Sequence, residues 1–129
     1  MKLRIRNNSL RFRLDQKDME ALLHDGQVES HTQFAPGIQL LICVARCHQT
    51  PLLAATCEAQ KITLYVRDDD ALEWMQNTET GFSTMQSTGE GNLRLLLEKD
   101  YPCLVEREGE SDEHAFAWPE EAGIKAHAC

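Results

Sequence analysis

The sequence has no long apolar run, and this absence excludes a membrane-spanning segment. No stretch reaches the roughly 18 apolar residues that a spanning helix requires. Residues 1–6 alternate charged and apolar side chains, whereas a secretory signal needs a continuous apolar core. We therefore expect a protein without membrane association or an export signal, located in the cytoplasm.

Motifs that bind metals or phosphates are also missing. The chain has no CxxC and no HxxxH spacing. On one strand, Cys43 and Cys47 would lie about 13 Å apart, too far to share an ion. Gly89 and Gly91 lack the lysine, hydroxyl residue and helix that complete a phosphate-binding loop. The five cysteines are odd in number and, without an export signal, are expected as reduced thiols. We expect no cofactor and no metal site.

The size and charge of the chain limit its class. Its 129 residues fit one domain, which buries roughly two-thirds of its unfolded surface. The net charge of −8 is uneven, because residues 1–66 carry +2 and residues 67–129 carry −10. The acidic total disfavours non-specific nucleic-acid binding by the whole molecule. It is compatible with a local basic face.

Apolar periodicity predicts strands and helices in a regular order. Residues 2–6 and 10–14 alternate with period two around Asn7, which tolerates the left-handed backbone of a tight turn. Asp15 is expected to cap a helix that ends at Gly26, and Asp68 to cap a second helix. The other predicted elements are strands over 28–34, 38–45, 52–57, 61–66, 81–85 and 93–97, and the second helix over 69–77.

The two halves of the chain resemble each other. A shift of 52 residues places Leu10, Phe12 and Leu14 on Ile62, Leu64 and Val66. Further drift places residues 40–42 on 95–97 and Cys47 on Cys103. The alternative to duplication is chance, since any two strand–helix–strand units share an apolar rhythm. The order predicts an α+β fold, mainly antiparallel β with two short helices. Its two similar strand-strand-helix-strand-strand halves would form a small barrel or sandwich.

The domain is expected to span residues 1–105, with pseudo-repeats at about 2–47 and 52–104. Residues 106–129 then read as an acidic, partly flexible tail, because the run 106–113 has five carboxylates and no apolar face. Within this tail, residues 115–118 are expected to dock on the core. Burial of Phe116 and Trp118 is worth about 1.5–3 kcal/mol each.

Over roughly residues 2–46 and 53–98, the pattern resembles the swapped-hairpin unit of bacterial AbrB-type regulators. In those proteins two units form a barrel, and arginines on its loops contact DNA. Residues 14–16 (LDQ) and 66–68 (VRD) replace the strand-ending Ile-Pro usual in the regulators. The resemblance therefore implies a fold and not DNA binding.

A second resemblance covers nearly the whole chain. Residues 2–6 (KLRIR), 8–11 (NSLR), 93–96 (LRLL) and 98–101 (EKDY), followed by Cys103, are similar to a small bacterial family of unknown function. That family carries no assigned activity, so the resemblance implies no mechanism.

One polar cluster follows an apolar strand. If the strand continues, Glu98 and Asp100 share one face, and Lys99 takes the other. Two carboxylates near the thiol of Cys103 could bind a cation or perform acid–base work. A nucleophilic cysteine would need a histidine, and His114 is the nearest downstream. The alternative is a solvated strand end, with Lys99 paired to a carboxylate and Cys103 buried.

The first hairpin should carry a basic face. Its members, on the side opposite the apolar residues, are Lys2, Arg4, Arg6, Arg11 and Arg13. These cations repel one another and need anions, supplied either by nucleic acid or by the chain's own residues 106–113. We favour the acidic segment. No aromatic residue interleaves with the cations, so stacking on single strands is not indicated.

These features favour a small non-catalytic binding or interaction domain, with a protein partner or a second copy as candidate partners. Two alternatives stay open. One is a nucleic-acid-binding regulator that uses the basic hairpin. The other is a small enzyme centred on Glu98, Asp100 and Cys103. The sequence leans away from an enzyme and does not give a ligand or substrate.

Overall fold

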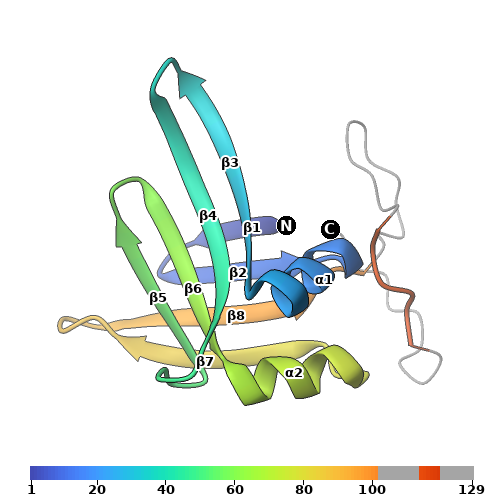
Figure 1. Ribbon diagram of the computed structural model, residues 1–129. Coiled ribbons are helices and arrows are strands. Elements are labelled where there is room, and N and C mark those ends of the chain that lie inside the picture. The colour runs from blue at the N-terminus through green and yellow to red at the C-terminus, as the bar shows by residue number, and fades with distance from the viewer. Residues whose placement is uncertain (102–113, 120–129) are drawn as a thin grey trace.

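The computed structural model describes residues 1–101 and 114–119, which form two four-stranded sheets and two helices (Figure 1). The first half contains β1 (Lys2–Arg6), β2 (Ser9–Leu14), α1 (Gln16–Asp25), β3 (Gln27–Ala35) and β4 (Ile38–Cys47). The second half contains β5 (Leu53–Glu58), β6 (Lys61–Arg67), α2 (Asp68–Gln76), β7 (Gly81–Ser87) and β8 (Asn92–Lys99). The predicted α+β class, with strand-strand-helix-strand-strand order in each half, is confirmed.

Each sheet combines one hairpin from the first half of the chain with one hairpin from the second half. Sheet A has the order β1-β2-β8-β7, and sheet B has the order β3-β4-β6-β5. In each sheet the central pair, β2 with β8 or β4 with β6, is parallel, and the flanking pairs are antiparallel. The strands of sheet A run across the direction of those of sheet B (Figure 1). Antiparallel pairing therefore predominates, within two mixed sheets.

The sheets do not close into a barrel, so of the two predicted arrangements the sandwich is the one allowed. Where β5 lies near β7, the two strands are joined by hydrogen bonds from a side chain and not by backbone hydrogen bonds. The amide of Gln86 accepts from Ala55 N at 2.7 Å and donates to Ala55 O at 2.9 Å. One amide group can satisfy a single residue of the neighbouring edge, which leaves the two sheets separate at this place.

The parallel pairs correct the internal alignment. Phe12 is opposite Leu97, and Leu64 is opposite Val44. If Phe12 corresponds to Leu64, then Val44 corresponds to Leu97, so residues 95–97 match 42–44 rather than the predicted 40–42. The sequence comparison missed this because both stretches are runs of apolar residues with no internal landmark. Duplication itself stays a prediction, and Cys103 lies outside the described residues.

The core lies between the inner faces of the sheets and the helices. Its buried members are Phe12, Leu14, Met19, Leu22, Val44, Leu53, Leu64, Val66, Ala71, Trp74, Leu95 and Leu97. These residues recur with period two on the strands and at helical spacing on α1 and α2, which explains why the apolar pattern predicted the elements.

The two helices begin differently. Asp15 caps α1 as predicted, because its side chain accepts from Asp18 N while the Asp18 side chain accepts from Asp15 N. In α2 the predicted cap is wrong. Arg67 holds the N-cap position without a side-chain cap, and Asp68 is the first helical residue. The carboxylate of Asp68 instead accepts from Arg46 Nη1 at 2.5 Å.

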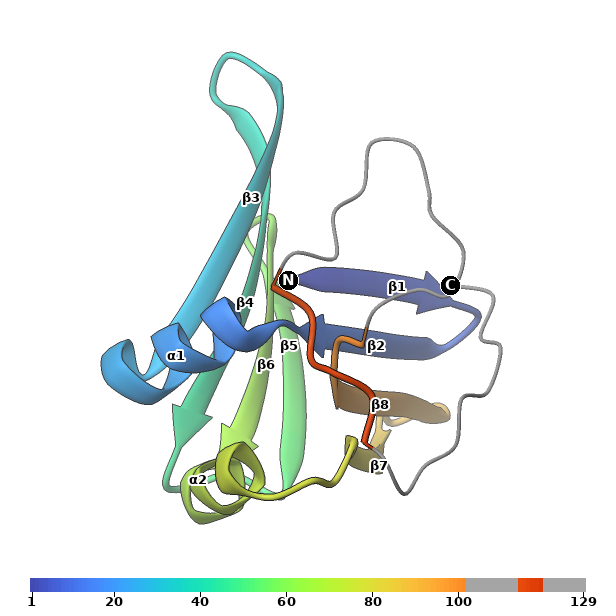
Figure 2. The ribbon, with the colours of Figure 1, turned by 90° about the vertical axis from the view of Figure 1, so that its right-hand side faces the viewer.

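Residues 114–119 return to the end of sheet A (Figure 2). Phe116 N donates to Asp100 O at 2.7 Å, and its ring packs against the core. Gln16 N donates to His114 O at 2.9 Å. Trp118 stacks on Tyr101 with 4.9 Å between ring centroids. The packing of Phe116 agrees with the prediction that residues 115–118 dock on the core.

Candidate binding surface

The outer face of sheet A, opposite the core, carries most of the positive charge of the first half. Alternation in β1 and β2 turns the apolar side chains inward and the basic side chains outward. The hairpin register then places Lys2 opposite Arg13 and Arg4 opposite Arg11. We call this surface the cationic face. Its basic members are Lys2, Arg4, Arg6, Arg11, Arg13 and Arg94.

Arg94 is the member that sequence reasoning missed. It lies on β8 opposite Ser9, and alternation places it on the same face as Glu98. Its own position in an alternating stretch was visible in the sequence. Its membership in the face follows only from the pairing of β8 with β2, two strands far apart in the chain.

Two carboxylates lie among these cations. Glu98 accepts from Arg11 in a two-pronged contact, with Nε–Oε1 at 2.5 Å and Nη2–Oε2 at 3.2 Å. The Lys2 ammonium lies 3.1 Å from Asp100 Oδ2, an ion pair without a directed hydrogen bond. The bidentate contact of Glu98 fixes the plane of the Arg11 guanidinium group. Glu98 therefore orients Arg11 on the cationic face, while Asp100 only neutralises the charge of Lys2.

Four cations on the face have no carboxylate partner among residues 1–101 and 114–119. Arg4, Arg6 and Arg94 are exposed, and Arg13 is half-buried. Burial lowers the pKa of Arg13, and the neighbouring charge of Arg11 lowers it further. The nearby carboxylates of Glu98 and Asp100 act in the opposite sense and raise this pKa, so burial is the largest cause of the shift.

Lys99 points the other way, into the core side of the sheet. It is 5% exposed, and its ammonium donates to Asn77 O at 2.5 Å. The ammonium also lies 5.8 Å from the centroid of the Trp74 ring and 5.6 Å from that of Phe116. Burial lowers the pKa of Lys99. The alternative of a solvated strand end, with Lys99 paired to a carboxylate, does not fit the described residues, because Lys99 is buried and donates to a backbone carbonyl.

The proposed enzyme centre is only partly within the described residues. Glu98 and Asp100 lie beside cations, as above, whereas Cys103 and the acidic run 106–113 lie outside the described residues. His114 is exposed. Within the part of the chain that the structure describes, no group of three or more His, Cys, Asp or Glu side chains is arranged to hold a metal ion.

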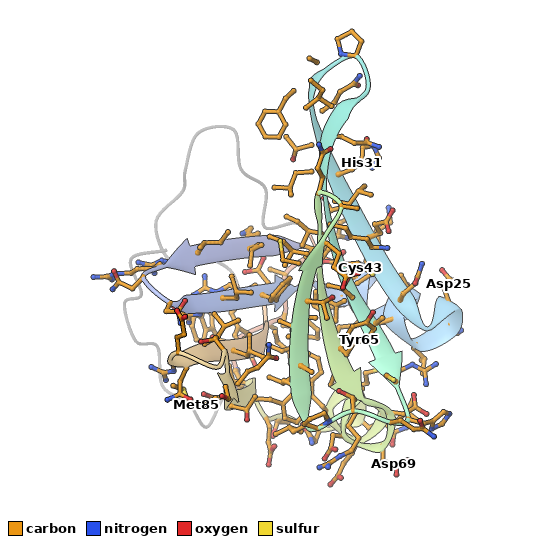
Figure 3. The ribbon with its side chains drawn as sticks, turned by 90° about the vertical axis from the view of Figure 1, so that its left-hand side faces the viewer. Asp25, His31, Cys43, Tyr65, Asp69 and Met85 are labelled. Atoms are coloured by element: carbon orange, nitrogen blue, oxygen red, sulfur yellow. The ribbon has the colours of Figure 1, made fainter. Side chains whose placement is uncertain are left out.

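The cationic face reaches the edge of its sheet. β1 is the outermost strand of sheet A, and Met85 on β7 marks the opposite edge (Figure 3). On the core side of β1, the Ile5 side chain is 59% exposed. The edge therefore combines cations on one side with an uncovered apolar side chain on the other.

Comparison with known families identifies the family of this chain. Residues 1–120 match the family model described as a family of unknown function, DUF7009. The chain belongs to this family. The expectation of a family of unknown function is therefore confirmed, and the family assigns no activity. No curated protein and no solved structure matches the chain.

The comparisons therefore support neither the nucleic-acid-binding regulator nor the small enzyme. The AbrB likeness stays a resemblance of pattern. Among the helices of the described residues, none has the length and apolar character needed to cross a membrane.

Proposed function

We propose that this DUF7009 member is a non-catalytic interaction domain that binds an acidic protein segment on the cationic face. One observation carries the proposal: six cations share one face of sheet A with two carboxylates. A short acidic segment is favoured over nucleic acid because the net charge of −8 repels a long polyanion at long range, whereas a short segment carries few charges beyond those that the cationic face neutralises.

The face costs stability in the absence of an anion. Like charges directly opposite each other on neighbouring strands are destabilising, by a fraction of a kcal/mol to about 1 kcal/mol per pair. Lys2 with Arg13 and Arg4 with Arg11 are two such pairs. The ion pairs of Glu98 with Arg11 and of Asp100 with Lys2 relieve part of this repulsion, while Arg4 and Arg13 have no carboxylate partner among the described residues. A surface that retains repulsion is suited to a ligand that removes it.

The non-catalytic part of the proposal rests on how the carboxylates are engaged. Glu98 is held by Arg11, and Asp100 lies against Lys2. A general base needs a carboxylate that can take a proton from a substrate. Both groups lie against cations, and this contact is sufficient to account for them without catalysis.

Binding of a fluorescent octaglutamate peptide to the full chain tests the proposal. We expect binding at low salt that weakens as salt rises, and at least a tenfold loss in the double variant Arg4→Gln/Arg94→Gln. The matched control is Arg67→Gln, because Arg67 is exposed and pairs with Asp70 outside the cationic face. Equal binding by both variants, or none by the wild type, rejects the proposal. Tighter binding of a 20-base-pair DNA duplex would instead favour the regulator.

The chain's own residues 106–113 were the anion favoured by the sequence. A full-length variant with Glu106, Glu108 and Glu110 changed to Gln measures their competition. If they compete for the cationic face, this variant binds octaglutamate several-fold more tightly than the wild type. Unchanged affinity would contradict that competition and leave an external partner as the ligand.

A further inference from the structure

The edge strand β1 presents two different rows of side chains. Lys2, Arg4 and Arg6 face outward, and Leu3 and Ile5 face the core side. No described strand pairs with its outer edge. An uncovered edge has unpaired backbone groups that accept a further strand.

Charge distinguishes β1 from the other edge strands of the two sheets. The other edges in the described part of the chain are β7, β3 and β5. β7 carries no charged residue, β3 carries Glu29, and β5 carries Glu58. β5 and β7 are also joined by Gln86. An acidic strand is therefore complementary to β1 and not to these edges.

Strand geometry specifies the sequence of such a ligand. Side chains that share a face of a strand recur at about 6.6–6.8 Å, and a neighbouring strand lies about 4.7–4.9 Å away. Carboxylates at every second position would lie beside Arg4 and Arg6, which are exposed, whereas the Lys2 ammonium is buried against Asp100. The intervening side chains would then cover Leu3 and Ile5.

We propose that the acidic segment binds as an added strand beside β1, with carboxylates alternating with apolar residues. This inference rests on the proposed function and specifies its ligand. Backbone hydrogen bonds to the edge that no described strand occupies supply part of the affinity, and the two rows supply the specificity. Ile5, 59% exposed, becomes covered in the complex.

Three seven-residue peptides, each with four glutamates and three valines, test the binding mode on the full chain. The first alternates the two residues, the second groups them in blocks, and the third is the alternating peptide with N-methylated backbone amides. Net charge and side-chain composition are the same in all three. We expect the alternating peptide to bind at least tenfold more tightly than the other two.

A variant of the chain tests the apolar row. Ile5→Glu should weaken binding of the alternating peptide at least fivefold, because the new carboxylate would lie against the acidic ligand. Ile38→Glu is the matched control, since Ile38 is 52% exposed on a strand of sheet B. We expect it to bind as the wild type does.

The outcomes separate this inference from the proposed function. Equal binding of alternating and block peptides, both lost in Arg4→Gln/Arg94→Gln, would overturn strand addition and leave the acidic ligand in place. Equal binding of the N-methylated peptide would likewise overturn it, without relying on the folding of any variant. Binding of none of the peptides, with none of octaglutamate, would overturn both.

Discussion

Arg46 and Lys99 hold matching places in the two halves of the chain. Arg46 lies opposite Val66 on β4, and Lys99 lies opposite Leu14 on β8. Each donates to backbone carbonyls at the C-terminal end of the helix in its own half. Arg46 reaches Leu22 O at 2.9 Å, and Lys99 reaches Asn77 O at 2.5 Å. A cation there satisfies acceptors that the helix leaves unpaired and complements the helix dipole.

The Arg46 side chain should be a large contributor to stability. It donates to Leu22 O, to Leu23 O and to the carboxylate of Asp68. Arg46→Met leaves these acceptors without their donor. We expect the free energy of unfolding to fall by about 2–3 kcal/mol, measured by urea denaturation.

The control for this change is Arg67→Met. The pair of Arg67 with Asp70 spans one helical turn at the surface. Such exposed pairs contribute at most about 1 kcal/mol. Equal losses in the two variants would contradict the role assigned to Arg46.

The buried Lys99 should make stability depend on pH. Burial lowers its pKa in the folded chain, so the unfolded chain binds more protons between that lowered pKa and the ordinary lysine value of about 10.4. Stability therefore rises with pH across this window. Relative to Lys99→Met, the wild type should gain free energy of unfolding as pH rises, measured by urea denaturation at several pH values.

Lys61 supplies a control of opposite sign. A hydrogen bond from Lys61 to Glu29 raises the pKa of this lysine. Its stabilisation is present below the ordinary lysine pKa of about 10.4 and is lost as pH rises through the raised value. As pH rises from about 10.4 through the raised pKa of Lys61, the wild type should lose stability relative to Lys61→Met. The same slope for both lysines would refute the assignment.

Gly81 should not tolerate a side chain. A Cβ placed there would lie 1.9 Å from Leu97 O and 2.8 Å from Glu98 Cα, both backbone atoms of the paired strand β8. Gly81→Ala must therefore displace β7 from β8, and we expect a loss of about 1–3 kcal/mol or more. Thermal or urea unfolding measures the loss.

Gly91→Ala is the comparison for that variant. The nearest atom to a Cβ at this position is Thr88 Oγ1 at 3.9 Å, an ordinary contact. Gly91 also lacks a positive φ. Stability should stay unchanged or rise by up to about 1 kcal/mol. A loss like that of Gly81→Ala would show that glycine is needed for another reason.

The sequence predicted features that depend on near neighbours. Asn7, with φ of 51°, turns the first hairpin, and Gly26, with φ of 78°, ends α1. The cap of α1 formed as expected because Asp15 and Asp18 satisfy each other within one turn. The cap of α2 did not, because Arg67 rather than Asp68 holds the N-cap position, and the carboxylate of Asp68 accepts from Arg46 on a distant strand.

The candidate surface was predictable in part for the same reason. Alternation within one hairpin was sufficient to gather the five cations of residues 2–13. Placing Arg94 and Glu98 among them required knowing that β8 pairs with β2. The direction of Lys99 followed from alternation, whereas its partner, Asn77 O, lies on a separate segment brought near by folding.

The amino-acid sequence by itself determined the strands, the helices and the side of the first hairpin that is basic. Period two and the turn residues act over a few positions, and one strand has only two faces. The tertiary structure alone decided which hairpins share a sheet, that the sheets stay open and that β1 is an edge. These outcomes depend on which apolar faces pack together across the whole chain, and no local pattern records that choice.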